Sequence, residues 1–368
     1  MLKKKLKLYY RLFIQRIFIL IYGKIKIENI NSLHEIRIKK IENLKSDKQP
    51  HIKYLLYEIK NGRIYTDGNE TVAILNKNNL ISNISFQQIN GELKDVKFNK
   101  VLEIGTPKIK KKINGRVFNL AQGGSGNNYF HFMYDLIPKI YLLEKVLSIS
   151  SIDYFYVPKI KTWQKKIYLL FGINEKKLID SEKFKHIESN LIISVNHPWY
   201  HQGYIQEEVK NIPDWIINSN RIKFLPLLKK FNNNKKIFLD RSSSVYSHCQ
   251  IQNNNELIDA LTKRGFTSYK VEELSIEEQI HLFNDADIIV GAHGAAFANI
   301  MFCKSKTKII EIIPMSHPNR KCERISEILN LKYFRIITED TRSDKDFPFN
   351  IFLNENNLNK IFKAIDLY

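Results

Sequence analysis

Residues 285–313 read DADIIVGAHGAAFANIMFCKSKTKIIEII, and this stretch decides the fold class. The apolar, β-branched run from Asp287 to Val290 predicts a buried strand, and Lys308 to Ile313 predicts the next one. Between them, small residues from Gly291 to Ala296 predict a tight turn, and Phe297 to Phe302 predicts a helix. This order is typical of a crossover unit on a parallel sheet.

The turn itself favours an anion. Small residues at the carboxyl end of a parallel strand let a ligand approach the backbone, and the N–H groups of the following helix favour negative charge. His293 is the polar side chain in the middle of this turn. The turn therefore predicts a phosphate site. The alternative is an ordinary strand-to-helix connection in which His293 caps a carbonyl, because Gly-x-His-Gly is not the dinucleotide fingerprint.

The length and composition of the chain limit its number of domains and its classes of partner. A chain of 368 residues has room for two domains, and 43% hydrophobic with 12% aromatic residues argues against disorder. The net charge of +20 fits nucleic acid, an anionic membrane or acidic substrates. Because the basic residues are spread along the chain without a nucleic-acid motif, we expect no nucleic acid partner. The three cysteines lack metal-type spacing and are odd in number, so we expect a reducing cytoplasm and no metal.

The first 45 residues form a basic amphipathic segment. Residues 1–27 mix lysines with an apolar run that Arg11 and Arg16 interrupt, which fits neither a signal peptide nor a spanning helix. The segment predicts a helix in the interface of an anionic membrane, peripheral on the inner face of the plasma membrane. The alternative is a helix packed on its own protein.

An α/β domain is expected over residues 46–232. Its part from Ile52 to Val117 alternates short β-like runs with Asn/Gly turns. A glycine-rich segment then leads to a helix in which His131 and Asp135, four residues apart, share one face. A carboxylate there orients an imidazole as a general base. The alternative is a surface His–Asp pair. Pro138 is expected to kink or restart this helix.

The same domain continues with a strand over 152–158, a helix over 163–171 and a strand over 191–195, which is αβ alternation. The loop after the last strand contains His197 and Trp199. An aromatic face suits a sugar ring and an imidazole suits its hydroxyls, so both are candidates for sugar binding. The alternative is a proline-ordered loop that packs its tryptophan inside.

The polar run Asn232 to Asn234 predicts the linker to a second Rossmann-like domain over 233–345. Its first strand ends at Arg241, and Ser275 with Glu278 predicts a capping box at a helix start. The last segment, 346–368, predicts a helix that packs back towards the first domain.

Together these motifs resemble glycosyltransferase family 61, the capsular polysaccharide biosynthesis glycosyltransferases. The resemblance covers roughly residues 118–315 and departs at Ala296-Phe297-Ala298, where the family usually has Gly-Leu-Thr. The matching residues are Asn128-Tyr-x-His131 with Asp135-x-x-Pro138, Arg241, Asn254-x-Glu256, Glu273-Leu-Ser275 with Glu278-Gln-Ile280, Gly291-Ala-His293-Gly294-Ala295 with Asn299, and Glu311.

The resemblance implies a GT-B-like α/β fold, with two Rossmann-like domains facing across a cleft and the domain over residues 46–232 on the acceptor side. It also implies inverting transfer from a nucleotide-sugar to a glycan or lipid-linked glycan in surface (capsular or lipo-) polysaccharide synthesis. Neither metal nor cofactor is expected. The other readings are transfer of another group, such as pyruvyl, and a basic nucleic-acid or membrane-surface binding protein. The expected roles are His131 or Asp135 as base; Arg241, His293, Gly294 and Ala295 on the donor diphosphate; Glu311 and Asn299 on the nucleoside; and Asn128, His197 and Trp199 on the acceptor side.

Overall fold

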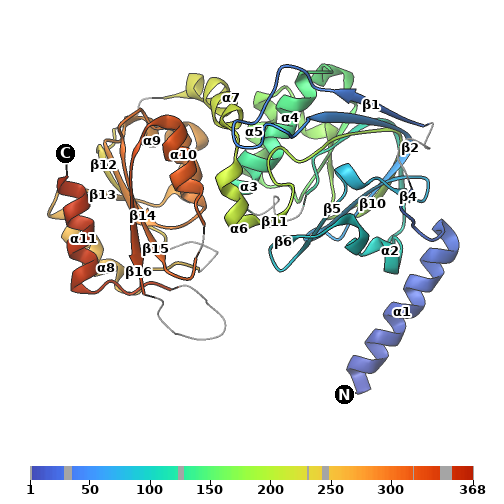
Figure 1. Cartoon of the computed structure of the whole chain (residues 1–368), viewed down its shortest axis with the longest axis horizontal. Helices are drawn as coiled ribbons and strands as arrows, with labels where there is room; N and C mark the ends of the chain where they lie inside the picture. Colours follow the sequence, from blue (N-terminus) through green and yellow to red (C-terminus); the bar gives the residue numbers. More distant parts are fainter. Residues whose placement is uncertain are drawn as a thin grey trace. The chain divides into compact units, whose positions relative to one another are not determined.

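The computed structural model describes residues 2–28, 35–122, 128–229, 232–242, 248–317, 319–339 and 350–367. The chain divides into two units, Met1–Glu208 and Val209–Tyr368, each with its own sheet (Figure 1). The fold is mixed α/β, as the sequence predicts.

Unit 1 is built on one large sheet with the strand order β11-β6-β5-β3-β2-β10-β7-β8-β9, to which β1 and β4 add at β2 and β3. The strands are β1 (Ile36–Lys40), β2 (Leu55–Thr66), β3 (Thr71–Asn76), β4 (Asn79–Leu80), β5 (Phe86–Ile89), β6 (Glu92–Leu93), β7 (Lys111–Asn119), β8 (Tyr154–Val157), β9 (Leu178–Asp180), β10 (His186–Val195) and β11 (Gly203–Tyr204).

This sheet joins two different halves. β10, β7, β8 and β9 are parallel to one another, whereas the strands from β2 to β11 pair antiparallel. The β-rich segment Ile52 to Val117 therefore lies in the main sheet of unit 1, inside the first domain as expected. β2 runs through Asn61-Gly62, where a turn was expected, because Asn61 takes a φ of +49° and the strand continues on the far side.

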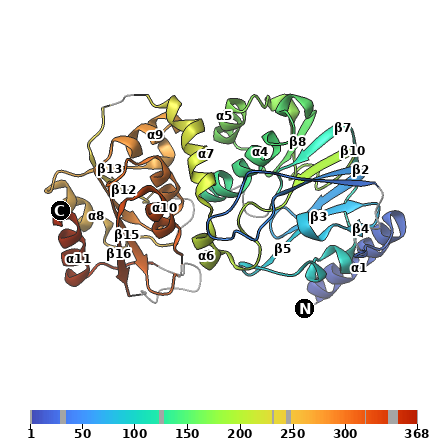
Figure 2. The same ribbon diagram turned by 45° about the horizontal axis from the view of Figure 1, so that its top comes forward.

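The helices of unit 1 lie between and beside these strands (Figure 2). They are α1 (Leu2–Tyr22), η2 (Ser82–Ile84), η3 (Val96–Phe98), α2 (Val101–Ile104), α3 (Tyr129–His131), η4 (Phe132–Leu136), α4 (Ile137–Glu144), η5 (Ile149–Ser151), α5 (Thr162–Leu170), η6 (Glu175–Lys177) and α6 (Ile205–Glu208).

Helix α1 is attached to unit 1 by its last turns and extends away from the sheet (Figure 1). It ends at Tyr22 because Gly23 takes a φ of +84°, a left-handed conformation that closes the helix. The Tyr22 hydroxyl accepts a hydrogen bond from the backbone N–H of Lys110 at 3.0 Å, and its ring lies 5.1 Å from that of His186. None of the described helices is both long and apolar enough to cross a membrane.

Unit 2 is a five-stranded parallel sheet with the order β13-β12-β14-β15-β16. Its elements are η7 (Val209–Asn211), α7 (Asp214–Phe224), η8 (Leu225–Leu227), β12 (Lys236–Leu239), α8 (Asn254–Thr262), β13 (Thr267–Tyr269), η9 (Val271–Glu273), α9 (Ile276–Asp285), β14 (Ile288–Ala292), η10 (Ala295–Phe302), β15 (Lys308–Pro314), α10 (Lys321–Leu329), β16 (Lys332–Thr338) and α11 (Glu355–Asp366).

Helices cover both faces of this sheet (Figures 1 and 2). Ile310 and Ile312 of β15 join the apolar cluster with α8 and α11, whereas Glu311, between them, points to α10. This alternation follows from the period of two along a strand. The predicted crossover unit is confirmed as β14, η10 and β15, although η10 is a 3-10 helix. The capping box of Ser275 and Glu278 is also confirmed.

The division into units differs from the expected one in two places. The residues around Asn234 belong to unit 2, because its amide donates to the carbonyl of Gly265 at 2.7 Å. Helix α7 precedes this run and also packs in unit 2, since Arg221 donates to the carbonyls of Met301 and Cys303. A polar asparagine run resembles a linker in composition alone.

The last helix, α11, packs on unit 2 and not on the first unit as expected. Its Ile361 and Ile365 are buried in the cluster that covers β15 and β16. Lys308 of β15 donates to the carbonyl of Ile365 at 2.6 Å, which holds the end of the helix. An amphipathic pattern predicts that a helix is covered but does not identify what it covers.

Candidate active site

His131 and Asp135 form a hydrogen-bonded pair in unit 1. Asn128 caps α3 by accepting bonds from the N–H groups of Phe130 and His131, and a π-helical turn, η4, follows. His131 Nδ1 lies 2.8 Å from Asp135 Oδ2. Since a carboxylate only accepts, Nδ1 carries a proton, and in the neutral form of the ring Nε2 holds the lone pair. The His131 side chain is 20% exposed and that of Asp135 1%, so the imidazole alone reaches solvent.

Trp199 holds the carboxylate from the other side. Its Nε1 donates to Asp135 Oδ1 at 3.0 Å and to the carbonyl of Tyr134 at 3.1 Å. That carbonyl is available because Pro138, four residues later, has no N–H to donate. Trp199 is completely buried, so its face is not available to an acceptor; instead it fixes the position of Asp135.

His197 approaches the Asp135 oxygen that His131 binds. Its Nδ1 accepts hydrogen bonds from the N–H groups of Trp199 and Tyr200, so Nε2 carries the proton. This Nε2 is 3.9 Å from Asp135 Oδ2 and has no hydrogen-bond partner among the described residues. Burial lowers the pKa of His197 well below its usual value, so the ring is neutral.

The glycine-rich residues 123–126 and Asn127 lie outside the described part of the chain.

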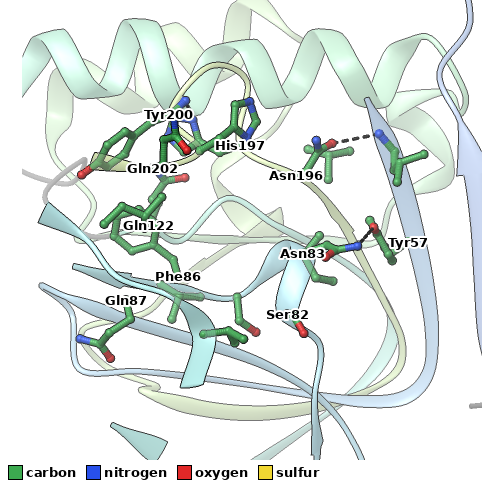
Figure 3. A pocket seen from close by; sticks show the side chains of 18 of the residues that line it. Tyr57, Ser82, Asn83, Phe86, Gln87, Gln122, Asn196, His197, Tyr200 and Gln202 are labelled. Atoms are coloured by element: carbon green, nitrogen blue, oxygen red, sulfur yellow. Dashed lines mark hydrogen bonds between the residues drawn. The ribbon is translucent and has the colours of Figure 1, made fainter. Parts of the chain in front are cut away.

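Unit 1 also contains a cavity of about 780 Å³, which His197 and Lys139 line whereas His131 and Asp135 do not. Amide and aromatic side chains surround it (Figure 3), which is a lining suited to hydroxyl groups and ring faces. Two further side chains on its wall, His197 and Lys139, approach Asp135. The polar and aromatic lining includes Asn83, Phe86, Gln122, Asn196, Tyr200 and Gln202.

A second polar site lies in unit 2, at the carboxyl end of β14. Arg241, just after β12, donates to the carbonyl of His293, and Lys321, at the start of α10, donates to that of Gly294 at 2.8 Å. A Cβ at Gly294 would overlap the Arg241 guanidinium, so the absence of a side chain is what admits this cation. The first turn of η10 starts at Ala295. Burial lowers the pKa of both cations.

Glu311 fixes the position of His293 through a hydrogen bond. Its Oε1 accepts from His293 Nδ1 at 2.5 Å and from Cys322 Sγ at 3.1 Å, and its Oε2 accepts from the Tyr333 hydroxyl at 2.6 Å. Burial would raise the pKa of Glu311, but His293 and these bonds lower it. Burial lowers the pKa of His293 to about 4. Glu311 is fully buried, so in this conformation it positions His293, and its expected contact with a ribose stays a prediction.

Asn299 is also fully buried, and its amide donates to Gln279 Oε1 at 2.9 Å, which links η10 to α9. Contact of Asn299 with a nucleoside stays a prediction. Close to this turn, the carboxylate of Asp240 accepts hydrogen bonds from Ser242 and Asn254. These contacts show how the motif residues build the turn that carries His293.

Two histidines that the sequence did not single out extend the basic site. The rings of His293 and His317 lie 4.5 Å apart, and those of His248 and His317 lie 6.3 Å apart. Burial, with repulsion from neighbouring cations, lowers the pKa of His248 to about 4 and that of His317 to about 3. Such mutual repulsion is relieved when an anion binds between the groups.

Two groups of side chains in unit 2 have the atoms to hold a metal ion. In each group the candidate ligand atoms lie within 4.8 Å of one another. The groups are His248, Cys249 and His317, and His293, Glu311 and Cys322. Cys249 has a φ of +56°, which is uncommon for a residue with a side chain. Lys321, His248 and His317 escaped sequence reasoning because only the fold brings them to one turn.

The fold and the two sites first define a class: a mixed α/β protein with a histidine–carboxylate pair in one unit and a basic turn in the other. The family model described as Glycosyltransferase 61 matches residues 129–310, a range that includes His131, Arg241 and His293. The chain belongs to glycosyltransferase family 61, which confirms the resemblance seen in its motifs.

No curated protein matches the chain significantly in sequence. Among solved structures, a point mutant of a flavo di-iron protein from Thermotoga maritima is similar at 9% identity. The match covers 90% of this chain and 98% of that one, with a TM-score of 0.24. At this score the likeness supports no argument about fold or function.

Proposed function

We propose that the protein is an inverting glycosyltransferase that moves a sugar from a nucleotide-sugar to a glycan acceptor in surface polysaccharide biosynthesis. The observation that carries the proposal is the hydrogen bond from His131 Nδ1 to the buried Asp135, since in the neutral imidazole Nε2 can then accept a proton. In a single displacement, the acceptor oxygen bonds to the anomeric carbon as the bond to the diphosphate breaks. The acceptor proton passes to His131 Nε2, and the nucleoside diphosphate leaves.

The donor diphosphate is assigned to the turn after β14. Arg241 and Lys321 already bind backbone carbonyls there, and His293, His248 and His317 lie beside them. Phosphate oxygens would accept charge-assisted hydrogen bonds from these groups, and the first turn of η10 adds N–H groups. The same groups stabilise the leaving charge as it develops. Glu311 acts through His293.

We also propose that transfer needs no metal ion. The two groups could ligate one, and one of them includes the Glu311 carboxylate, but Arg241 and Lys321 lie next to them and repel a divalent cation. Cys322 adds little attraction, because burial raises the pKa of its thiol well above the usual value. The same two cations attract an oxyanion, so charge favours the diphosphate at this site.

The arrangement of the units belongs to the proposal as well. The family resemblance implies a GT-B enzyme with one Rossmann-like domain for the donor and another on the acceptor side. Separate sheets and separate polar sites in units 1 and 2 support this proposal.

A donor screen by thermal unfolding tests the function. A ligand that binds only the folded chain raises its melting temperature, so we expect one of the UDP-, GDP-, CMP- or dTDP-sugars to raise it. At 100 times its dissociation constant the stabilisation is about 2.7 kcal/mol. Phosphoenolpyruvate serves as the alternative donor. If it alone stabilises the chain, pyruvyl transfer replaces glycosyl transfer.

We propose further that α1 rests in the interface of an anionic membrane. Leu6, Tyr9, Phe13 and Leu20 lie along one side of the helix and are 61–85% exposed. The sequence of α1 carries six basic residues and no acidic one. Buried apolar area and attraction to anionic lipid both strengthen such binding.

Phe13→Glu should weaken binding to vesicles that contain phosphatidylglycerol by roughly 10-fold to 150-fold, as sedimentation measures it, since burying one such side chain contributes about 1.5–3 kcal/mol. Ile222→Glu changes a similarly exposed apolar residue of α7 and serves as the control. Equal sedimentation of both variants and the unchanged chain would remove α1 from membrane binding. Purely zwitterionic vesicles should bind all three weakly.

A further inference from the structure

Lys139 is a buried cation on the wall of the cavity in unit 1. It lies on α4, one helical turn beyond Asp135, and is 5% exposed. Among the residues that the structure describes, Nζ has no hydrogen-bond partner and no carboxylate within 4.0 Å. A buried ammonium without a partner is costly, so buried lysines are normally paired.

Asp135, the nearest carboxylate on the same helical face, forms no hydrogen bond with Lys139. Its two oxygens accept from His131 and Trp199, and neither lies within 4.0 Å of Nζ, so Asp135 attracts Lys139 only over a longer distance. Burial lowers the pKa of Lys139 to about 8, against that attraction, and the group stays largely protonated at neutral pH. A charge is therefore held at the cavity wall with its hydrogen-bond donors unused by the described residues.

The rest of the cavity supports a polar, acidic ligand. Lys53, Lys94 and Lys139 line it against one carboxylate, that of Asp95. The amide side chains and tyrosines described above suit sugar hydroxyls and ring faces. His197 presents a buried Nε2–H donor beside them.

We propose that this cavity binds a saccharide bearing an oxyanion, a carboxylate or a phosphate, which accepts hydrogen bonds from Lys139. The inference rests on the proposed function, because the saccharide would be the acceptor whose hydroxyl His131 deprotonates. It adds the class of acceptor: an acidic glycan in place of a neutral one. Lys139 is then a specificity-determining residue at the site.

Calorimetry on the full chain, without donor, tests this directly. The probes are a hexuronate-terminated disaccharide, its neutral hexose isostere and a hexose phosphate. We expect an acidic probe to bind roughly 30-fold or more tightly than the neutral isostere, as for a buried charge pair. Whichever acid binds better identifies carboxylate or phosphate as the source. Equal affinity for the neutral isostere would overturn the proposal without any variant.

Substitutions of Lys139 distinguish a role in recognising an acidic saccharide from a role in stabilising the fold. Lys139→Met should abolish the preference for the acidic probe while the melting temperature stays equal or rises, because a desolvated charge is removed. Lys145→Gln, an exposed lysine at the end of the same helix, should change neither. A fall in stability with the acidic preference retained would show that Lys139 serves the fold alone.

The donor screen keeps this result distinct from the proposed function. If a nucleotide-sugar stabilises the chain but no acidic probe is preferred, the acidic acceptor is refuted and the transferase stands. If an acidic probe binds through Lys139 while no donor does, the cavity assignment stands and the transferase is refuted.

Discussion

Replacing His131 with alanine should lower kcat by about 100-fold to 10,000-fold, the usual contribution of a positioned general base. The affinity for the nucleotide-sugar should stay nearly unchanged, because His131 lies in unit 1 and the proposed donor residues lie in unit 2. Single-turnover rates and donor binding by calorimetry measure the two effects separately. Turnover within about threefold of the unchanged enzyme would remove His131 from the mechanism.

Two further variants decide between His131 and Asp135 as the base. Asp135→Asn keeps the shape but no longer holds the imidazole with its proton on Nδ1, so turnover should fall as well. If Asp135 were itself the base, Asp135→Asn would abolish turnover while His131→Ala retained part of it. Trp199→Phe removes only the Nε1 donor and should cost less than either, because the His131–Asp135 hydrogen bond remains.

Replacing Arg241 with alanine should weaken binding of the nucleoside diphosphate by about 10-fold to 150-fold, the worth of a hydrogen bond to a charged group of about 1.5–3 kcal/mol. Lys321→Met should act in the same direction, since both cations sit on the turn after β14. Affinity for the nucleoside without phosphates should not change. Calorimetry with both ligands checks the prediction.

Gly294→Ala supplies an independent test of the same site. The added Cβ would overlap the Arg241 guanidinium and displace it, so diphosphate affinity should fall although every charge is kept. Lys360→Ala, on the exposed side of α11, removes one charge elsewhere and is the control. If Arg241→Ala and Lys360→Ala weaken binding equally, the effect is general charge and the site assignment is refuted.

Local patterns predicted much of unit 2. A β-branched run before small residues is enough to define β14 and its turn, and the motif places Arg241 and His293 at the carboxyl edge of the sheet, because parallel strands end at the same edge. The same local reasoning predicted the His131–Asp135 pair, since four residues along a helix bring two side chains together.

Composition was a poor guide to long-range packing. The asparagine run at 232–234 resembled a linker but lies inside unit 2, and α11 packs on β15 and β16 instead of the first unit. The mixed sheet of unit 1 was likewise beyond sequence reasoning, because β2 and β10 pair although they are far apart in the chain. Strand pairing at that separation depends on burial that no local window contains.

By itself, the sequence determined the family, the parallel sheet of unit 2 and the residues that begin each site, because these depend on short motifs and on periodicity. Only the tertiary structure showed that Trp199 binds Asp135 and that Glu311 binds His293. It also showed that the rings of His248 and His317 lie beside the turn that carries His293. It also decided that Lys139 is a buried charge on a cavity wall. Desolvation and pairing depend on neighbours far apart in the chain, so they exist only once the chain has folded.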